Sequence, residues 1–192
     1  MTHNARNTIP ATHFGVASRY RNPATGEEYA KVFPGKLYGT TETLMLVTLL
    51  GSCVSACIRD PMAGIGGMNH FMLPGGQPSK LDPKADHRHG QSAMDTLIAA
   101  LERRGALRER MEVKLFGGGI MLERSAGNSV GERNIEFVRS YCQERDLRIA
   151  ASDLGRDCAR KIIYNPSSGI VQVKRVVESE TPIGRNMGAA YG

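Results

Sequence analysis

One cysteine and one histidine are the side chains in this sequence best suited to catalysis. Cys53 stands in the segment Gly-Ser-Cys-Val, and His70 follows it seventeen positions later in Met-Asn-His-Phe. A thiol becomes a nucleophile when a neighbouring imidazole takes its proton. The pair therefore contains the minimum parts of a nucleophilic hydrolase. The alternative is a structural role, because a lone cysteine in an apolar strand is commonly a small buried hydrophobic side chain.

The residues between them predict a hairpin. Residues 54–60 and 65–73 have the composition of strands, and residues 61–64, Pro-Met-Ala-Gly, have that of a turn. With this turn, Asp60 lies opposite Ile65, and the residue numbers of every facing pair add to the same value.

That register brings the two side chains to one face. His70 lies opposite Ser55, one diagonal step from Cys53, and side chains alternate between the faces of a strand. Diagonal neighbours on one face are about 7–8 Å apart at the backbone. A slip of one residue would move His70 to the other face, so the prediction depends on the turn.

A hydrolase of this kind needs two further groups. Gly51 and Ser52 break the strand before the cysteine, which allows backbone N–H groups to turn toward a developing oxyanion. The imidazole also needs a partner that fixes its tautomer, and the two nearby candidates are Thr48 and Asn69.

The surrounding pattern predicts one mixed domain of helices and strands. Residues 43–50 are expected to form a strand that is buried on both faces. A helix is predicted over 91–104, and a second helix begins near Ser129, which has capping-box spacing to Glu132. Further strands are expected at 112–116, 147–152, 161–164 and 170–176. We divide the chain into an N-terminal polar segment with short strands or loops (1–40), the main domain (41–177) and a flexible tail (178–192).

Composition narrows the class of protein. Residues 1–30 lack the apolar core of a signal peptide, and the longest apolar run is too short to span a bilayer, so we expect a cytoplasmic protein without membrane insertion. The four cysteines include no Cys-x2-Cys pair, and we expect no metal site. The net charge of +6 is spread over scattered basic residues, and no nucleic-acid-binding motif is present.

Eight segments spread over about residues 43–176 carry a resemblance to a known family. They are Thr48–Val54, Cys57–Asp60, Gly66–Pro74, Ala93–Met94, Lys114–Gly118, Gly131–Asn134, Asp153–Gly155 and Arg160–Lys161. Together they resemble the CheD family, the chemoreceptor glutamine deamidases of bacterial chemotaxis. The resemblance implies a cysteine hydrolase that converts selected receptor glutamines to glutamate without a metal or organic cofactor. It places the nucleophile at Cys53, the base at His70 and the third catalytic residue at Thr48.

The resemblance also implies an α+β fold, a single-domain layered sandwich of mixed β-sheets flanked by helices, like that of the cytotoxic necrotizing factor deamidases. The implied partners are the cytoplasmic helices of chemoreceptors and a CheC-type phosphatase. Two rival hypotheses remain at this point. One is a non-catalytic adaptor that binds receptors or the phosphatase, and the other is a cysteine amidase or protease with a different substrate.

Overall fold

The chain folds into two β-sheets and two α-helices over the residues that the computed structural model describes, 12–75, 87–120 and 129–176. In chain order the elements are β1 (His13–Gly15), β2 (Ser18–Arg21), β3 (Glu28–Lys31), β4 (Lys36–Thr40), β5 (Met45–Leu50), β6 (Val54–Asp60), β7 (Ile65–His70), α1 (Gly90–Glu102), a 3₁₀ turn (Arg108–Arg110), β8 (Glu112–Gly117), α2 (Val130–Glu144), β9 (Arg148–Leu154), β10 (Ala159–Tyr164) and β11 (Val171–Val176).

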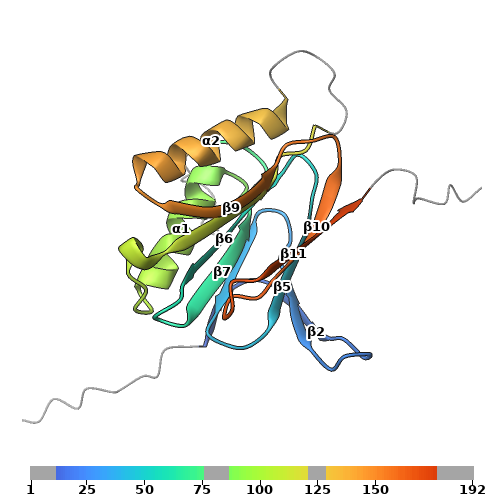
Figure 1. The fold of residues 1–192 in the computed structure, drawn as a ribbon, viewed down its shortest axis with the longest axis vertical. Coiled ribbons are helices and arrows are strands. Elements are labelled where there is room, and N and C mark those ends of the chain that lie inside the picture. Colours follow the sequence, from blue (N-terminus) through green and yellow to red (C-terminus); the bar gives the residue numbers. More distant parts are fainter. Residues whose placement is uncertain (1–11, 76–86, 121–128, 177–192) are drawn as a thin grey trace, which may run out of the picture.

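The sheets stack as layers. The six-stranded sheet has the order β1-β4-β7-β6-β8-β9 and the five-stranded sheet the order β11-β10-β5-β3-β2. Strand pairing is antiparallel except between β8 and β9 and between β3 and β5. Both helices lie on one side of the six-stranded sheet, and the five-stranded sheet lies on the other (Figure 1). The predicted mixed α+β class is confirmed.

Two hydrophobic cores separate these layers. Strand β6 contributes to both, because Ala56 and Ile58 pack in the core under the helices while Cys57 packs between the sheets. This alternation is the two-residue period of a strand. The core between the sheets also takes Leu50 from β5 and Met68 from β7, so it fixes how the ends of these strands face each other.

The predicted hairpin register is confirmed. The β6–β7 ladder runs from Asp60 opposite Ile65 to Cys57 opposite Met68. The two predicted helices are also present, and the capping box between Ser129 and Glu132 begins α2 as expected. Of the three predicted segments, 178–192 lies outside the described residues.

One strand differs from its prediction. Residues 43–50 were expected to be buried on both faces, yet Leu49 of β5 is 58% exposed. The helices cover only the six-stranded sheet, so this strand, which belongs to the other sheet, keeps an outward face.

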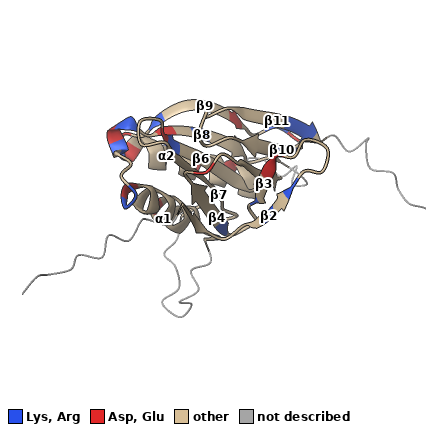
Figure 2. Ribbon diagram, turned by 90° about the horizontal axis from the view of Figure 1, so that it is seen from below, with Lys and Arg blue, Asp and Glu red and all other residues tan. Residues whose placement is uncertain are grey.

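Neither described helix has the length and apolar character needed to cross a membrane. Lys and Arg are interspersed with Asp and Glu around the ribbon (Figure 2).

A buried carboxylate fixes the hairpin turn that sets the register. Asp60 is 0% exposed, and one of its oxygens accepts the N–H groups of Met62 and Ala63 at 2.9 and 3.1 Å. The other oxygen accepts Leu107 N–H at 2.9 Å and the Arg110 guanidinium at 2.6 Å. Burial raises the pKa of Asp60, but the hydrogen bonds from Arg110 and the backbone outweigh it and lower the pKa to about 2.

We expect Asp60→Asn to lower the free energy of unfolding by about 3 kcal/mol at pH 7, because it breaks a buried ion pair. The stabilisation requires the ionised carboxylate, whose pKa lies below its ordinary value of 3.8. It is therefore complete above about pH 4 and is lost as the pH falls toward about 2. Urea unfolding of both proteins at pH 7 and at lower pH measures the difference.

Glu102→Gln is the matched control, since it removes the exposed partner of Arg108 and should cost no more than about 1 kcal/mol. An Asp60→Asn effect as small as this control, or one that does not shrink in acid, would contradict the assigned role.

Candidate active site

Cys53 lies where the chain crosses from one sheet to the other. Strand β5 of the five-stranded sheet ends at Leu50, and β6 of the six-stranded sheet begins at Val54. Cys53 is half-buried and packs against the core between the sheets. His70 is the last residue of β7 and is 2% exposed. The two residues thus lie at the same end of the neighbouring strands β6 and β7, where the chain crosses from one sheet to the other.

One backbone pair sets the direction of both side chains. Val54 and Phe71 exchange both of their N–H to carbonyl hydrogen bonds at 3.0 Å, and their side chains pack in the core under the helices. The residue before each of them therefore faces the opposite layer, between the sheets. Cys53 and His70 are these residues, so they occupy one face on a diagonal, as the hairpin register predicts.

Thr48 on β5 reaches His70 across the gap between the sheets. Its Oγ1 lies 2.8 Å from His70 Nδ1 and 2.8 Å from the carbonyl oxygen of Val32. A carbonyl only accepts, so the single hydroxyl proton goes to Val32, and Oγ1 must accept from Nδ1–H. The neutral ring then carries its proton on Nδ1, which leaves a lone pair on Nε2. That nitrogen is buried and has no hydrogen-bond partner among the described residues.

Burial keeps both reactive groups neutral. It lowers the pKa of His70 to about 4, against a smaller opposing effect of the Val32 carbonyl. It raises the pKa of the Cys53 thiol, partly offset by a hydrogen bond from the backbone N–H of the same residue. No hydrogen bond joins Sγ to Nε2 among the described atoms. Catalytic hydrogen bonds are often long until substrate binds. The resting pair is therefore a thiol beside a neutral imidazole.

The other candidate partner of the imidazole, Asn69, faces away from it. Asn69 Oδ1 accepts the N–H of Ala56 at 2.8 Å, and its Nδ2 contacts Met94 Sδ of α1 at 3.3 Å. Of the two candidates left open by the sequence, only Thr48 contacts His70. No group of three or more His, Cys, Asp or Glu side chains in the described ranges is arranged to hold a metal ion.

Three consecutive glycines support, from behind, the loop of residues 51–53 that carries the candidate nucleophile Cys53 (the nucleophile loop). The N–H groups of Gly118 and Gly119 donate to the carbonyls of Cys53 and Gly51, each at 2.8 Å. Gly117 has a φ of 111°, and a Cβ there would lie 2.1 Å from the Cys53 carbonyl oxygen. The sequence predicts a close backbone approach at this glycine run, and the structure confirms it.

A buried arginine, which sequence periodicity does not mark as functional, braces the segment behind these glycines. Arg160 of β10 is fully buried and donates to the backbone carbonyls of Asp153, Gly155 and Cys158. Gly155 in turn donates its N–H to the Gly117 carbonyl at 2.9 Å. The predicted strand at 161–164 begins one position after Arg160, and the only sequence signal for this residue is its place in the Arg160–Lys161 segment of the resemblance.

The comparisons with known proteins agree with one another. A family model described as CheD chemotactic sensory transduction matches residues 72–175, a range that begins two positions after His70. A protein of Methylobacillus flagellatus is 45% identical over 151 residues, which cover 78% of this chain and 74% of the relative. A protein of Janthinobacterium sp. (strain Marseille) is 46% identical over 165 residues, covering 85% and 81% of the two chains. Both relatives are named probable chemoreceptor glutamine deamidase CheD.

The Thr48 contact makes the protonation of His70 measurable. We expect ¹⁵N-detected NMR to show the Nδ1–H tautomer of His70 at pH 7 and a titration midpoint of about 4, because burial disfavours the imidazolium. A Nε2–H tautomer, or a His70 midpoint near the ordinary 6.5, would contradict the geometry.

Proposed function

The chain belongs to the CheD family, and on that premise we propose that it deamidates chemoreceptors, hydrolysing the side-chain amide of selected glutamines to glutamate and ammonia. The observation that supports this function most directly is the free Nε2 of His70, on the same face as the Cys53 thiol. Thr48 holds the imidazole in the tautomer that a general base requires. In this proposal Cys53 is the nucleophile, His70 the acid and base, and Thr48 the orienting residue.

The first half of the reaction forms a thioester. As Cys53 Sγ attacks the amide carbon of the substrate, the thiol proton passes to His70 Nε2. The amide π electrons move to oxygen and give a tetrahedral intermediate. Its collapse breaks the carbon–nitrogen bond, and Nε2 gives its proton to the departing nitrogen, which leaves as ammonia. Thr48 Oγ1 accepts a hydrogen bond from Nδ1–H throughout, and this favours the transient imidazolium.

The peptide between Ser52 and Cys53 is aimed to stabilise the oxyanion. The Ser52 carbonyl points to α2, where Asn134 donates to it at 3.0 Å. No peptide bond of the described chain is cis, so the N–H of Cys53 points the opposite way from that carbonyl. This N–H group lies against the Cys53 thiol. An oxygen on a carbon bonded to Sγ would therefore be close to this donor.

The second half of the reaction restores the enzyme. A water that enters after ammonia leaves gives a proton to His70 Nε2 while its oxygen attacks the thioester carbon. The new tetrahedral intermediate expels the Cys53 thiolate, which recovers the proton from Nε2, and the product is glutamate. Each step uses the same lone pair on Nε2, and none requires a group beyond the three side chains, the backbone and water.

The setting of the reaction follows from the same proposal. The substrate would be the cytoplasmic helices of chemoreceptors, so the protein would act in the cytoplasm, and a CheC-type phosphatase is a second proposed partner. We also propose that the two-sheet fold is related to the cytotoxic necrotizing factor deamidases. The stacking of two sheets, with Cys53 packed against the core between them, supports that relation.

We expect the purified protein to raise the mass of receptor-derived peptides by about 1 Da per modified glutamine, since an amide becomes an acid. Cys53→Ala and His70→Ala should abolish this change, and Cys57→Ala should keep it. Mass spectrometry with an ammonia assay measures both products. If receptor fragments gain no mass and release no ammonia, deamidation is refuted. Chemotaxis that survives Cys53→Ala would favour the adaptor instead.

We expect Thr48→Val to lower kcat about 100-fold, because the valine cannot accept from Nδ1–H and the imidazole loses its fixed tautomer. Thr48→Ser, which keeps the hydroxyl, should retain most of the activity. Steady-state kinetics of ammonia release compares the two variants. Equal losses in Val and Ser variants would argue that the side chain matters only for packing.

A further inference from the structure

The carboxamide of Asn134 joins the two segments that carry the proposed reactive groups. Asn134 lies in the second turn of α2 and is 0% exposed. Its Nδ2 donates to the carbonyls of Ser52 and Met72, each at 3.0 Å. Ser52 precedes Cys53, and Met72 follows His70 by two positions. One amide group therefore spans the gap between the nucleophile loop and the end of β7.

The chemistry of the amide fixes its orientation. Both carbonyls can only accept, so the NH₂ group, which has two hydrogens, must face them. Asn134 Oδ1 is consequently directed elsewhere, and it is buried without a hydrogen-bond partner among the described residues. An unsatisfied buried acceptor destabilises the folded state. A residue that served stability alone would be poorly chosen here, which indicates a role for the two N–H bonds themselves.

The backbone pairing between β6 and β7 ends next to the two carbonyls that accept from Asn134. After Cys57 opposite Met68, the only remaining backbone pair between the strands, in the described chain, is Val54 with Phe71. Beyond that pair the two strands separate, since Met72 N–H donates to the Arg88 carbonyl instead. Asn134 is the next link between them.

Helix α2 gives this link a rigid base. Its first turn is closed by the capping box, and a Cβ at Gly131 would lie 2.7 Å from the carbonyl oxygens of both Gly118 and Gly119. The helix therefore packs directly on the backbone that also holds the Gly51 and Cys53 carbonyls. The backbone one turn further along, which carries Asn134, is therefore held in place against this segment.

We propose that Asn134 is a positioning residue that fixes the plane of the Ser52–Cys53 peptide, so that the Cys53 N–H faces the oxyanion, and ties this peptide to the strand that carries His70. The inference rests on the proposed function and deepens it. Without the Asn134 bond the Ser52 carbonyl is free to rotate, and the N–H of Cys53 rotates with it. The loss then falls on the transition state, where the oxyanion exists, rather than on substrate binding.

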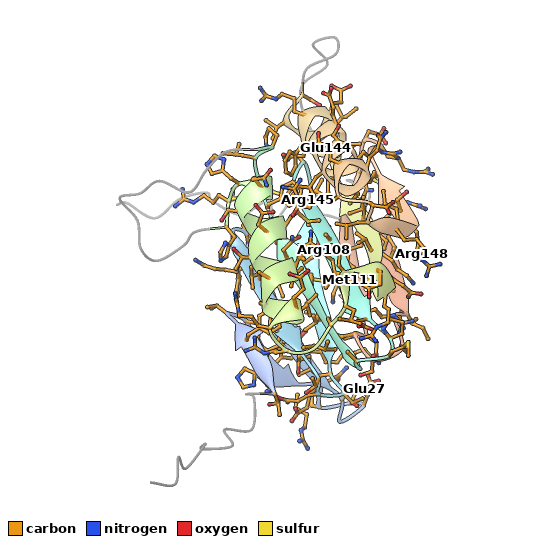
Figure 3. All side chains as sticks on the ribbon, turned by 90° about the vertical axis from the view of Figure 1, so that its left-hand side faces the viewer. Glu27, Arg108, Met111, Glu144, Arg145 and Arg148 are labelled. Carbon is orange, nitrogen blue, oxygen red and sulfur yellow. The ribbon has the colours of Figure 1, made fainter. Side chains whose placement is uncertain are left out.

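The test compares Asn134→Asp and Asn134→Ala with a matched control on the same helix. Asp has the same shape but presents an oxygen to both carbonyls, and Ala removes the link. The control is Tyr141→Phe, which deletes the 2.5 Å hydrogen bond from α2 to Asp95 of α1 without touching the nucleophile loop. Arg145, labelled in Figure 3, stacks on the same tyrosine ring, and its ion pair with Asp95 at 3.6 Å still links α2 to α1 in this variant.

The first readout separates kcat from KM in peptide deamidation. We expect both Asn134 variants to lose about 10- to 100-fold in kcat with KM within about twofold, because oxyanion contacts are absent in the ground state. Tyr141→Phe should keep both constants within about twofold, even where its Tm falls as far as that of the Asn134 variants.

The second readout needs no turnover. The probe is a receptor peptide in which an aldehyde replaces the glutamine side chain. The Cys53 thiol adds across the C=O of this aldehyde. A sulfur–carbon bond forms, the carbonyl π electrons move to oxygen, and the thiol proton balances the new alkoxide. The aldehyde peptide, which binds by forming this adduct, should have at least tenfold lower affinity for the Asn134 variants than for the wild type or Tyr141→Phe.

The outcomes separate the two proposals. Wild-type protein that neither deamidates peptide nor binds the aldehyde refutes the proposed function. Wild-type protein that does both, with Asn134 variants that match Tyr141→Phe, overturns the role of Asn134 alone. Loss of the folded state in both Asn134 variants would also overturn it, since the residue would then be structural.

Discussion

The hydrogen bond between Thr48 and His70 is the contact on which the proposed site depends. It connects the two sheets through an inner strand of each, β5 and β7, and decides which ring nitrogen keeps a lone pair. Its length is set by the core between the sheets, where Leu50 and Met68 pack from opposite sides. The way the two sheets stack therefore also determines the tautomer of His70. A shift of one sheet against the other would break the Thr48–His70 hydrogen bond, and the tautomer would no longer be fixed.

Local geometry explains which features the sequence reveals. The hairpin register follows from a four-residue turn, so the shared face of Cys53 and His70 could be predicted from nearby residues alone. The choice between Thr48 and Asn69 could not, because it depends on how β5 stacks on another sheet, and no local pattern encodes that. The exposed side of Leu49 was missed for the same reason, since apolar sequence does not say which face lacks a covering layer.

Burial has the same chemical consequence for both reactive groups. It disfavours the imidazolium and the thiolate alike, so each group rests in its neutral form at physiological pH. A pair of this kind differs from a preformed thiolate–imidazolium ion pair, in which the nucleophile is charged before substrate arrives. Proton transfer here belongs to the attack itself. The half-buried thiol is consequently a poor target for stray electrophiles and oxidants, which react with the thiolate.

The link from Asn134 to Ser52 spans 82 positions of the chain. A ribosome therefore makes Cys53, His70 and Thr48 well before it makes the helix that fastens the loop to its strand. During synthesis the N-terminal half contains the side chains of the proposed site but not Asn134, whose hydrogen bonds join the loop to the strand. On the proposed role of Asn134, the loop of Cys53 is therefore fastened to its neighbouring strand only once α2 has formed.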